Sequence, residues 1–208
     1  MTHEAARFRI VVLASGNGSN FQAVVDAASS GALGADVVGL VTDQPGAFAI
    51  DRASRADVGA TLVVRRQGEI RSDYDVRLAG AVAELRPDLV ILAGWMRLLT
   101  MAFLGRFAER VINIHPALPG EFPGTNAIER AFQEAQQHGL TRTGVMVHYV
   151  PGEGVDDGPV LATAEVPIRP DDTLATLSER VHETEHALLV EATALALAAL
   201  TAEHPFRE

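Results

Sequence analysis

Asn113 and His115, at the end of the apolar run 111–114, are the residues whose types and spacing best suit catalysis. Side chains two residues apart on a strand point to the same face, so the amide and the imidazole project together. Pro116 ends the strand because it lacks the N–H that a strand ladder needs. An amide and an imidazole can together polarise a carbonyl and move a proton, which is the minimum for acyl transfer. The alternative is an ordinary histidine in a strand-end turn.

Residues 15–20, with the sequence SGNGSN, form a glycine-rich loop between an apolar run and an amphipathic segment. Glycine lets the backbone turn tightly and approach a ligand, and a helix N-terminus offers free N–H groups to an anion such as phosphate. Phe21 stands where the dinucleotide fingerprint needs a third glycine, and the lysine of a nucleotide P-loop is absent. Asp43, after the second predicted strand, keeps a nicotinamide enzyme open as an alternative. A plain N-cap formed by Ser19 or Asn20 is compatible with phosphate binding.

Two further acidic positions are candidates for the same site. Asp156 and Asp157 are adjacent in a glycine-rich turn that follows the predicted strand carrying His148. A carboxylate close to an imidazole raises the pKa of the histidine and fixes its tautomer, whereas a solvated Asx turn is the structural alternative. In the last helical segment, Glu185 interrupts an i, i+4 row of apolar residues, so it requires a ligand hydroxyl or an arginine as a partner.

The composition of the 208 residues excludes several classes of protein. A net charge of −10 repels polyanions, so we expect no nucleic-acid partner. The chain has no cysteine, and His182 and His186 lack a third ligand, so we expect them at the surface and expect no metal site. Residues 1–4 are polar, unlike a signal peptide, and no run of about 18 uncharged apolar residues exists. We therefore expect a cytoplasmic protein that does not enter a membrane.

The order of the segments predicts the elements that must position these residues. β-branched runs alternate with amphipathic segments, which is typical of a parallel sheet covered by helices on both faces. We expect strands at residues 8–14, 36–42, 60–64, 89–93, 111–115, 144–150 and 159–168, and helices at 21–28, 48–56, 74–85, 127–137 and 174–200. Residues 116–124 contain three prolines and two glycines and should form a loop. With no repeat or linker, the sequence predicts one α/β domain over residues 1–208 with an open, mostly parallel twisted sheet.

Seven segments, in this order, resemble the phosphoribosylglycinamide formyltransferase family, folate-dependent enzymes of purine synthesis. The segments are residues 15–20 (SGNGSN), 92–99 (LAGWMRLL), 113–116 (NIHP), 122–124 (FPG), 148–150 (HYV), 156–159 (DDGP) and 185–186 (EH). The resemblance extends from Ile10 to about Val190 and implies a single formyltransferase domain. Residues 1–100 would form a Rossmann-like, phosphate-binding half, and residues 101–208 a catalytic and folate-binding half.

The resemblance also implies substrates and site residues. Two small molecules, glycinamide ribonucleotide and the formyl donor 10-formyltetrahydrofolate, would react without a metal on a monomer or homodimer. Direct acyl transfer would use Asn113 at the formyl oxygen, His115 as proton donor and Asp156 to raise the pKa of His115. His148 would support this centre. The ribotide would bind at Gly18, Ser19, Asn20 and Glu185, and the folate at Arg71, Met96, Arg97, Leu98, Leu99 and Asn113.

Three positions depart from the pattern of that family. The family usually reads Leu-Leu-Pro where residues 118–120 of this chain are Leu-Pro-Gly, and Asn126 replaces a histidine often found after the Pro-Gly pair. Met146 stands where a residue with a hydroxyl group is common in that family, two positions before His148. This last change removes a water-organising group near Asp156, so we expect the proton relay to be rearranged.

Other folate-dependent enzymes share the Asn-x-His and Asp arrangement. Methionyl-tRNA formyltransferase would need an additional basic RNA-binding domain, and formyltetrahydrofolate hydrolase an N-terminal regulatory domain, for which this sequence offers no segment. A sugar-nucleotide formyltransferase would lack the loop at residues 15–20. A non-catalytic anion- or nucleotide-binding module would explain that loop but would leave Asn113, His115 and Asp156 without a role.

Overall fold

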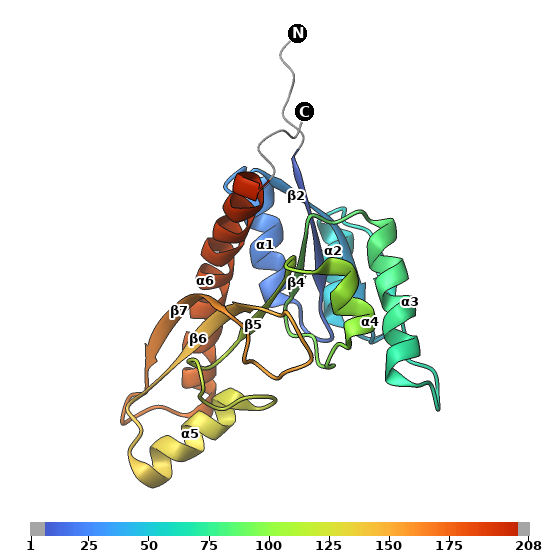
Figure 1. Ribbon diagram of the computed structural model, residues 1–208. Helices are drawn as coiled ribbons and strands as arrows, with labels where there is room; N and C mark the ends of the chain where they lie inside the picture. The colour runs from blue at the N-terminus through green and yellow to red at the C-terminus, as the bar shows by residue number, and fades with distance from the viewer. Residues whose placement is uncertain (1–6, 204–208) are drawn as a thin grey trace.

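The apolar runs predicted as strands form a seven-stranded sheet in the computed structural model, which describes residues 7–203 (Figure 1). The strand order is β3-β2-β1-β4-β5-β6-β7. Strands β1 to β5 pair in parallel, whereas β6 pairs antiparallel with both β5 and β7. The strands are β1 (Phe8–Leu13), β2 (Ala35–Thr42), β3 (Ala60–Leu62), β4 (Leu89–Leu92), β5 (Val111–His115), β6 (Arg142–Tyr149) and β7 (Val160–Pro167). The predicted fold class, a mostly parallel α/β sheet, is confirmed.

Helices cover both faces of the sheet, with α1 and α6 side by side on one face and α3 and α4 on the other (Figure 1). The helices are α1 (Ser19–Ser29), α2 (Phe48–Arg55), α3 (Arg71–Glu84), α4 (Met101–Leu104), α5 (Ala127–His138) and α6 (Leu174–Glu203). Successive side chains of a strand point to opposite faces. In β1, Ile10 and Val12 accordingly pack into the core under α1 and α6, whereas Val11 and Leu13 pack into the core under α3.

The predicted and observed elements differ mainly in short or polar stretches. Helix α3 begins at Arg71, three residues before the predicted start, because its first turn is polar and gives no apolar periodicity. Asp73 in that first turn interacts favourably with the helix dipole. Helix α4 and the 3₁₀ turn Gly105–Phe107 were not predicted, because elements of four and three residues are too short to show a period.

Helix α6 buries the row that contains Glu185. Leu177, Val181 and Leu189 are fully buried, and Glu185 is 5% exposed, so the predicted inward carboxylate is confirmed. Within residues 7–203, Leu174–Ala202 is the one helix that is long and apolar enough to cross a membrane by length and composition. It packs against α1, β6 and β7 with this row in the core, and we therefore assign it as a core helix of the fold.

The carboxyl ends of β1, β2, β4 and β5 meet at one edge of the sheet, because these strands run in parallel. Open α/β sheets bind ligands outside this edge. Three of these strands are followed by the loop at residues 15–20, by Asp43 and by Pro116.

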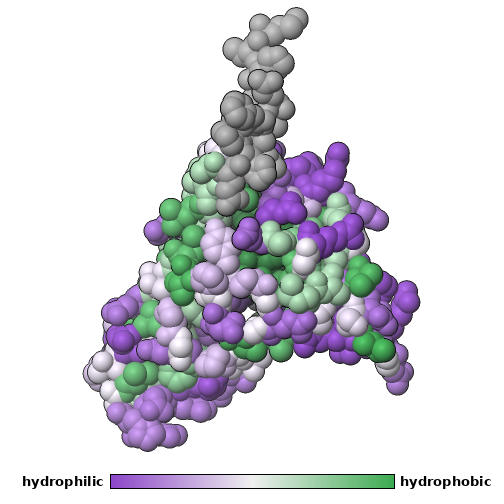
Figure 2. All heavy atoms as spheres, viewed as in Figure 1, coloured by the Kyte–Doolittle hydropathy of each residue, from purple (hydrophilic) through white to green (hydrophobic). Residues whose placement is uncertain are grey.

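The surface elsewhere is mixed, with mainly hydrophilic side chains over α5 at the lower left of Figure 2. Residues 1–4, which the sequence distinguished from a signal peptide, lie outside the described residues.

Candidate active site

A cleft of about 750 Å³ lies beside the carboxyl ends of β1, β4 and β5. Its walls come from residues 15–20, 92–99 and 113–116, together with His148, Asp156, His182 and Glu185 from the C-terminal half. Of the site residues predicted from the sequence, only Arg71 is not part of the lining. The structure therefore brings the glycine-rich loop, the strand-end pair and the inward glutamate to one place.

Asn113, His115 and Asp156 are in direct contact within this cleft. Asn113 Nδ2 donates a hydrogen bond of 3.1 Å to Asp156 Oδ1, and Asp156 Oδ2 lies 3.3 Å from His115 Nδ1. His148 lies directly across the β5–β6 ladder from Asn113, with its Nε2 atom 3.1 Å from Asn113 Nδ2 and 3.6 Å from Asp156 Oδ1. The carboxylate thus lies between two imidazoles and an amide.

Asp156 is positioned by an unusual backbone conformation. Its φ of 52° lies in the left-handed region, which aspartate tolerates better than most residues. The backbone N–H of Gly124 donates a hydrogen bond of 2.8 Å to Asp156 Oδ2. Burial alone would raise the pKa of the carboxyl, but the neighbouring His148 ring, the hydrogen bond from Gly124 and the charge of His115 hold that pKa below its usual value. Asp157 is exposed, so of the two adjacent acids only Asp156 reaches the site.

His115 is buried between two hydrogen-bond acceptors. Its Nε2 atom lies 3.1 Å from the carbonyl oxygen of Phe122, and its Nδ1 atom faces Asp156. Only the imidazolium can donate to both acceptors. Burial nevertheless lowers the pKa of His115 below its ordinary value, and the charge of Asp156 and the Phe122 carbonyl offset only part of this effect. The predicted contribution of Asp156 thus has the expected sign, but the net shift of the pKa in this cleft is downward.

The backbone fixes the orientation of His148. Its Nδ1 atom lies 2.8 Å from the carbonyl oxygen of Tyr149, so Nδ1 carries the proton and Nε2 of the neutral ring accepts from Asn113. Met146 lies opposite His115 in the same ladder and is buried. The neighbour of His115 on this strand is therefore a thioether that neither holds nor relays a proton.

The glycine-rich loop leads directly into α1. Gly18 is the N-cap residue with a φ of 75°, and no side chain caps the helix, so the alternative of a plain N-cap by Ser19 or Asn20 is not what the structure contains. A Cβ atom on Gly18 would lie 2.7 Å from Cβ of Ala49, so glycine is required by both the backbone and the packing of α2. Asn20 is 9% exposed, and its Oδ1 atom has no partner within the described residues. The first turn of α1 therefore faces the cleft without a capping side chain.

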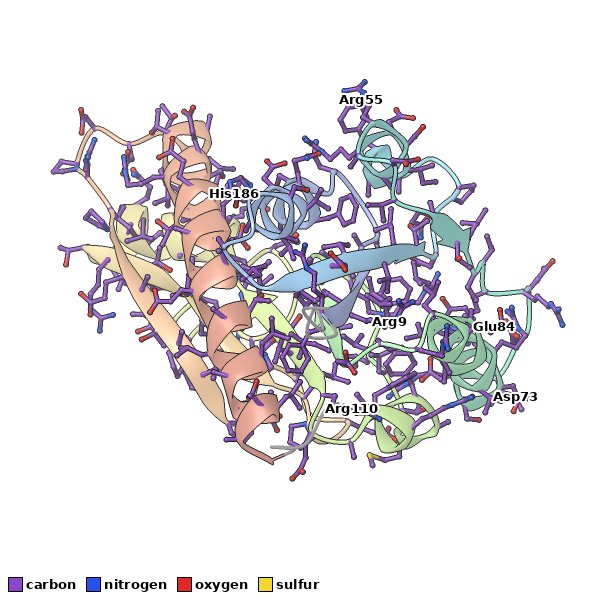
Figure 3. All side chains as sticks on the ribbon, turned by 90° about the horizontal axis from the view of Figure 1, so that it is seen from above. Arg9, Arg55, Asp73, Glu84, Arg110 and His186 are labelled. Carbon is purple, nitrogen blue, oxygen red and sulfur yellow. The ribbon has the colours of Figure 1, made fainter. Side chains whose placement is uncertain are left out.

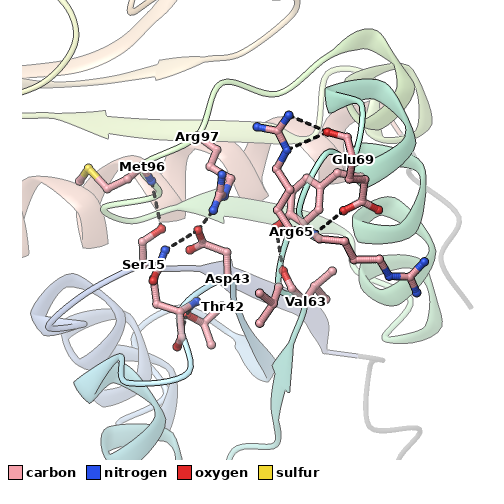
Figure 4. A network of polar contacts seen from close by, with 12 residues as sticks. Ser15, Thr42, Asp43, Val63, Arg65, Glu69, Met96 and Arg97 are labelled. Atoms are coloured by element: carbon pink, nitrogen blue, oxygen red, sulfur yellow. Dashed lines mark hydrogen bonds and ion pairs between the residues drawn. The ribbon is translucent and has the colours of Figure 1, made fainter.

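Two arginines predicted to bind folate are held by acidic partners. Arg97 Nε donates a hydrogen bond of 2.7 Å to Asp43 Oδ2, and its guanidinium lies 5.5 Å from the ring centre of Tyr74 (Figure 4). Asp43 is 2% exposed and its Oδ2 atom is engaged by Arg97, which disfavours its use as a ribose ligand. Arg71 lies outside the lining and bonds Glu153 and the carbonyl of Leu99. No local pattern in the sequence indicated that Asp43 and Glu153 would pair with these arginines.

Glu185 has a partner other than the ligand or arginine expected from the sequence. Its Oε2 atom lies 2.7 Å from Nδ1 of His182, and this carboxylate raises the pKa of His182. His182 is exposed, as expected. His186 is partly buried between α6 and α1, and its Nε2 atom is buried without a partner in the described part of the chain (Figure 3). Within residues 7–203 no group of three His, Asp or Glu residues is arranged to hold a metal ion.

The fold and this cleft define a class of protein, and the comparison with known proteins identifies it. The chain belongs to the formyl transferase family, whose family model matches residues 8–193. The phosphoribosylglycinamide formyltransferase of Dictyostelium discoideum is 39% identical, with 90% of this chain and 97% of that protein covered. The enzyme with the same name from Schizosaccharomyces pombe is 41% identical, with 88% and 94% covered.

Solved structures give the same result. Glycinamide ribonucleotide transformylase 1 from Geobacillus kaustophilus matches with a TM-score of 0.84 and 40% identity, covering 93% of this chain and 99% of that chain. The transformylase 1 from Symbiobacterium toebii matches with a TM-score of 0.86 and 36% identity, covering 92% and 89%. The family resemblance inferred from the seven sequence segments is therefore confirmed.

Proposed function

We propose that this protein transfers the formyl group of 10-formyltetrahydrofolate to the amine of glycinamide ribonucleotide, a step of purine biosynthesis that leads to IMP. The observation that carries this proposal is the contact of Asn113, His115 and Asp156 in a cleft that also contains the uncapped start of α1. The names of the relatives described above support the same reaction.

The ribotide would occupy the side of the cleft formed by the N-terminal half, residues 1–100. Backbone N–H groups at the start of α1 suit a phosphate, because they add to the positive end of the helix dipole. Glu185, from the opposite half, would accept hydrogen bonds from the ribose hydroxyls. The residues proposed to hold the ribotide are therefore Gly18, Ser19, Asn20 and Glu185.

The folate would occupy the other side, mainly with residues that follow β4. Leu98 and Met96 are 48% and 66% exposed, which is unusual for apolar side chains and suits the flat ring of a ligand. Arg97 would attract a ligand carboxylate, in competition with Asp43. Arg71 would act indirectly, through Leu99 and Glu153, since it lies outside the lining. Residues 101–208 complete this pocket with Asn113 at the formyl group.

The groups of the site are sufficient for direct acyl transfer. The neutral amine of the ribotide attacks the formyl carbon, and the oxyanion that forms would accept hydrogen bonds from Asn113 Nδ2 and protonated His115. These bonds would replace the contact of Asn113 with His148 Nε2 and that of His115 with the Phe122 carbonyl. A proton then moves from the attacking amine to the departing folate nitrogen, through His115 or a water held by Asp156. Negative charge on the oxyanion raises the pKa of His115 and thereby offsets the lowering caused by burial.

A turnover assay with purified protein tests this function. We expect formylation of glycinamide ribonucleotide by 10-formyltetrahydrofolate, and a decrease in kcat of roughly 10²–10⁴-fold for His115→Ala, because the acid is lost. Methionyl-tRNA as acceptor and water alone are the two control reactions. Turnover of either control without formylation of the ribotide would contradict the proposal and indicate another folate-dependent activity.

A further inference from the structure

Helix α2 binds the oxygen atoms of the glycine-rich loop. The backbone N–H of Ala49 donates a hydrogen bond of 3.1 Å to the carbonyl oxygen of Gly16. Arg52 binds the next residue twice, because its Nε donates 2.9 Å to the carbonyl of Asn17 and its Nη2 donates 3.0 Å to Asn17 Oδ1. Three oxygen acceptors of the loop thus bond to a helix that lies behind it.

This arrangement matters because a phosphate repels carbonyl oxygens and binds N–H groups. A loop that binds an anion must direct its carbonyl oxygens away from the ligand and its N–H groups toward it. Arg52 satisfies two acceptors of Asn17 in the middle of the loop and adds a positive charge behind them. In a chain with a net charge of −10, one cation at this place offsets unfavourable potential for a ribotide phosphate.

The guanidinium of Arg52 is ordered by an aromatic neighbour on its own helix. It lies 5.1 Å from the ring centre of Phe48, one turn earlier in α2. A planar guanidinium stacked in this way loses little additional freedom when it forms a two-point contact. Arg55 lies 5.5 Å from the same ring, but points outward from α2 (Figure 3) and has no hydrogen bond to the loop among the contacts of the described residues.

We propose that Arg52 is a positioning residue for the ribotide: it holds the oxygens of Asn17 away from the phosphate without touching the substrate itself. This inference rests on the proposed role of the loop at residues 15–20. Helix α2 contributes no side chain to the lining of the cleft. Through Arg52 it would nevertheless support the loop that binds the phosphate.

Arg55 provides a matched control for the test. Arg52→Gln and Arg55→Gln each remove one positive charge from the same helix and one contact with the same ring, but only the first removes the bonds to Asn17. For Arg52→Gln we expect the KM and the dissociation constant of glycinamide ribonucleotide to rise about tenfold, the size of one lost charge-assisted hydrogen bond. We expect kcat, the KM of the folate donor and all constants of Arg55→Gln to change less than about twofold.

Two further arms separate a positioning role from a structural one. Arg52→Lys keeps the charge but not the two-point fork, so its ribotide affinity should lie between wild type and Arg52→Gln. Glycinamide riboside, which lacks the phosphate, should bind equally to wild type and Arg52→Gln. Equal loss of ribotide and folate binding, or equal effects of Arg52→Gln and Arg55→Gln, would overturn the inference and leave the proposed function intact. Failure of the wild-type protein to bind the ribotide would refute the proposed function and this inference with it.

Discussion

Four nitrogen atoms surround the carboxylate of Asp156, at distances from 2.8 to 3.6 Å. Two belong to imidazoles, one to the Asn113 amide and one to the backbone of Gly124. The Asn113 amide and the Gly124 N–H donate hydrogen bonds to it and protonated His115 can donate another, so the charged carboxylate is the form that fits the site. A single side chain therefore orients the amide and offsets part of the lowering of the pKa of His115 that burial causes.

Replacement of this carboxylate should change the titration of His115. Asp156→Asn removes a negative charge that favours the imidazolium, so the pKa of His115 should decrease further below its ordinary value. The imidazolium would then be lost at lower pH than in the wild type. NMR titration of the ring resonances, assigned with His115→Gln, measures this directly. An unchanged or higher pKa would assign the role to His148 or to Asp157.

The two central glycines of the loop provide a contrasting pair of substitutions. A Cβ atom on Gly16 meets no atom within 4 Å, whereas one on Gly18 meets Ala49 and requires a left-handed backbone. We expect Gly18→Ala to lower the free energy of unfolding by more than about 1–2 kcal/mol, because the clash with Ala49 adds to the cost of that conformation for a residue with Cβ. Gly16→Ala should leave stability unchanged within about 0.5 kcal/mol and weaken ribotide binding, because its methyl group occupies the cleft.

Denaturant unfolding and calorimetry of ribotide binding distinguish the two glycine variants. If both lost stability equally, the packing of α2 against the loop would not be as described.

At the scale of elements, Glu153 ties the segment between β6 and β7 to the opposite side of the cleft. Its Oε2 atom lies 3.0 Å from Arg71 Nη2 on α3, and its Oε1 atom accepts a hydrogen bond of 2.9 Å from the backbone N–H of Met101. Asp156 follows three residues later. The position of this carboxylate therefore depends on contacts with α3, which belongs to residues 1–100, and with the first residue of α4.

We expect Glu153→Gln to loosen this segment selectively. Exposed ion pairs contribute about 0.2–1 kcal/mol, so amide hydrogen exchange in residues 150–158 should become roughly two- to fivefold faster. Glu165→Gln is the matched control, because Glu165 on β7 forms an exposed ion pair with Arg142 on β6, away from the cleft. If hydrogen exchange in residues 150–158 became equally faster in both variants, or did not change in Glu153→Gln, the contacts of Glu153 would not order the segment.

The sequence predicted the sheet and the lining of the cleft better than the contacts that hold them. Buried parallel strands are continuous apolar runs, and residues at their ends must meet at one edge, so Asn113 and His115 could be located from the chain alone. The pairing of Arg97 with Asp43 spans 54 residues, and that of Arg71 with Glu153 spans 82. Such pairs depend on how loops from different strands approach each other, and no local pattern encodes that distance.

At the scale of the whole molecule, a ligand that binds only the folded cleft must stabilise the fold. A folate analogue at one hundred times its dissociation constant should raise the free energy of unfolding by about 2.7 kcal/mol. NAD should have no effect, because the loop lacks the third glycine and Asp43 is engaged by Arg97. Thermal denaturation with each ligand measures the difference. Stabilisation by NAD and not by the folate analogue would favour a dinucleotide site.

The position of β4 within the sheet has a consequence for dividing the chain. β4 pairs with β1 on one side and with β5 on the other, and all four of its residues are buried. A fragment that ends near residue 100 would therefore expose one hydrogen-bonding edge of an entirely apolar strand, which is a template for aggregation. Residues 1–100 and 101–208 could therefore not be produced separately and recombined as soluble pieces. An insertion or fusion that preserves activity would have to leave the junction between β4 and β5 intact.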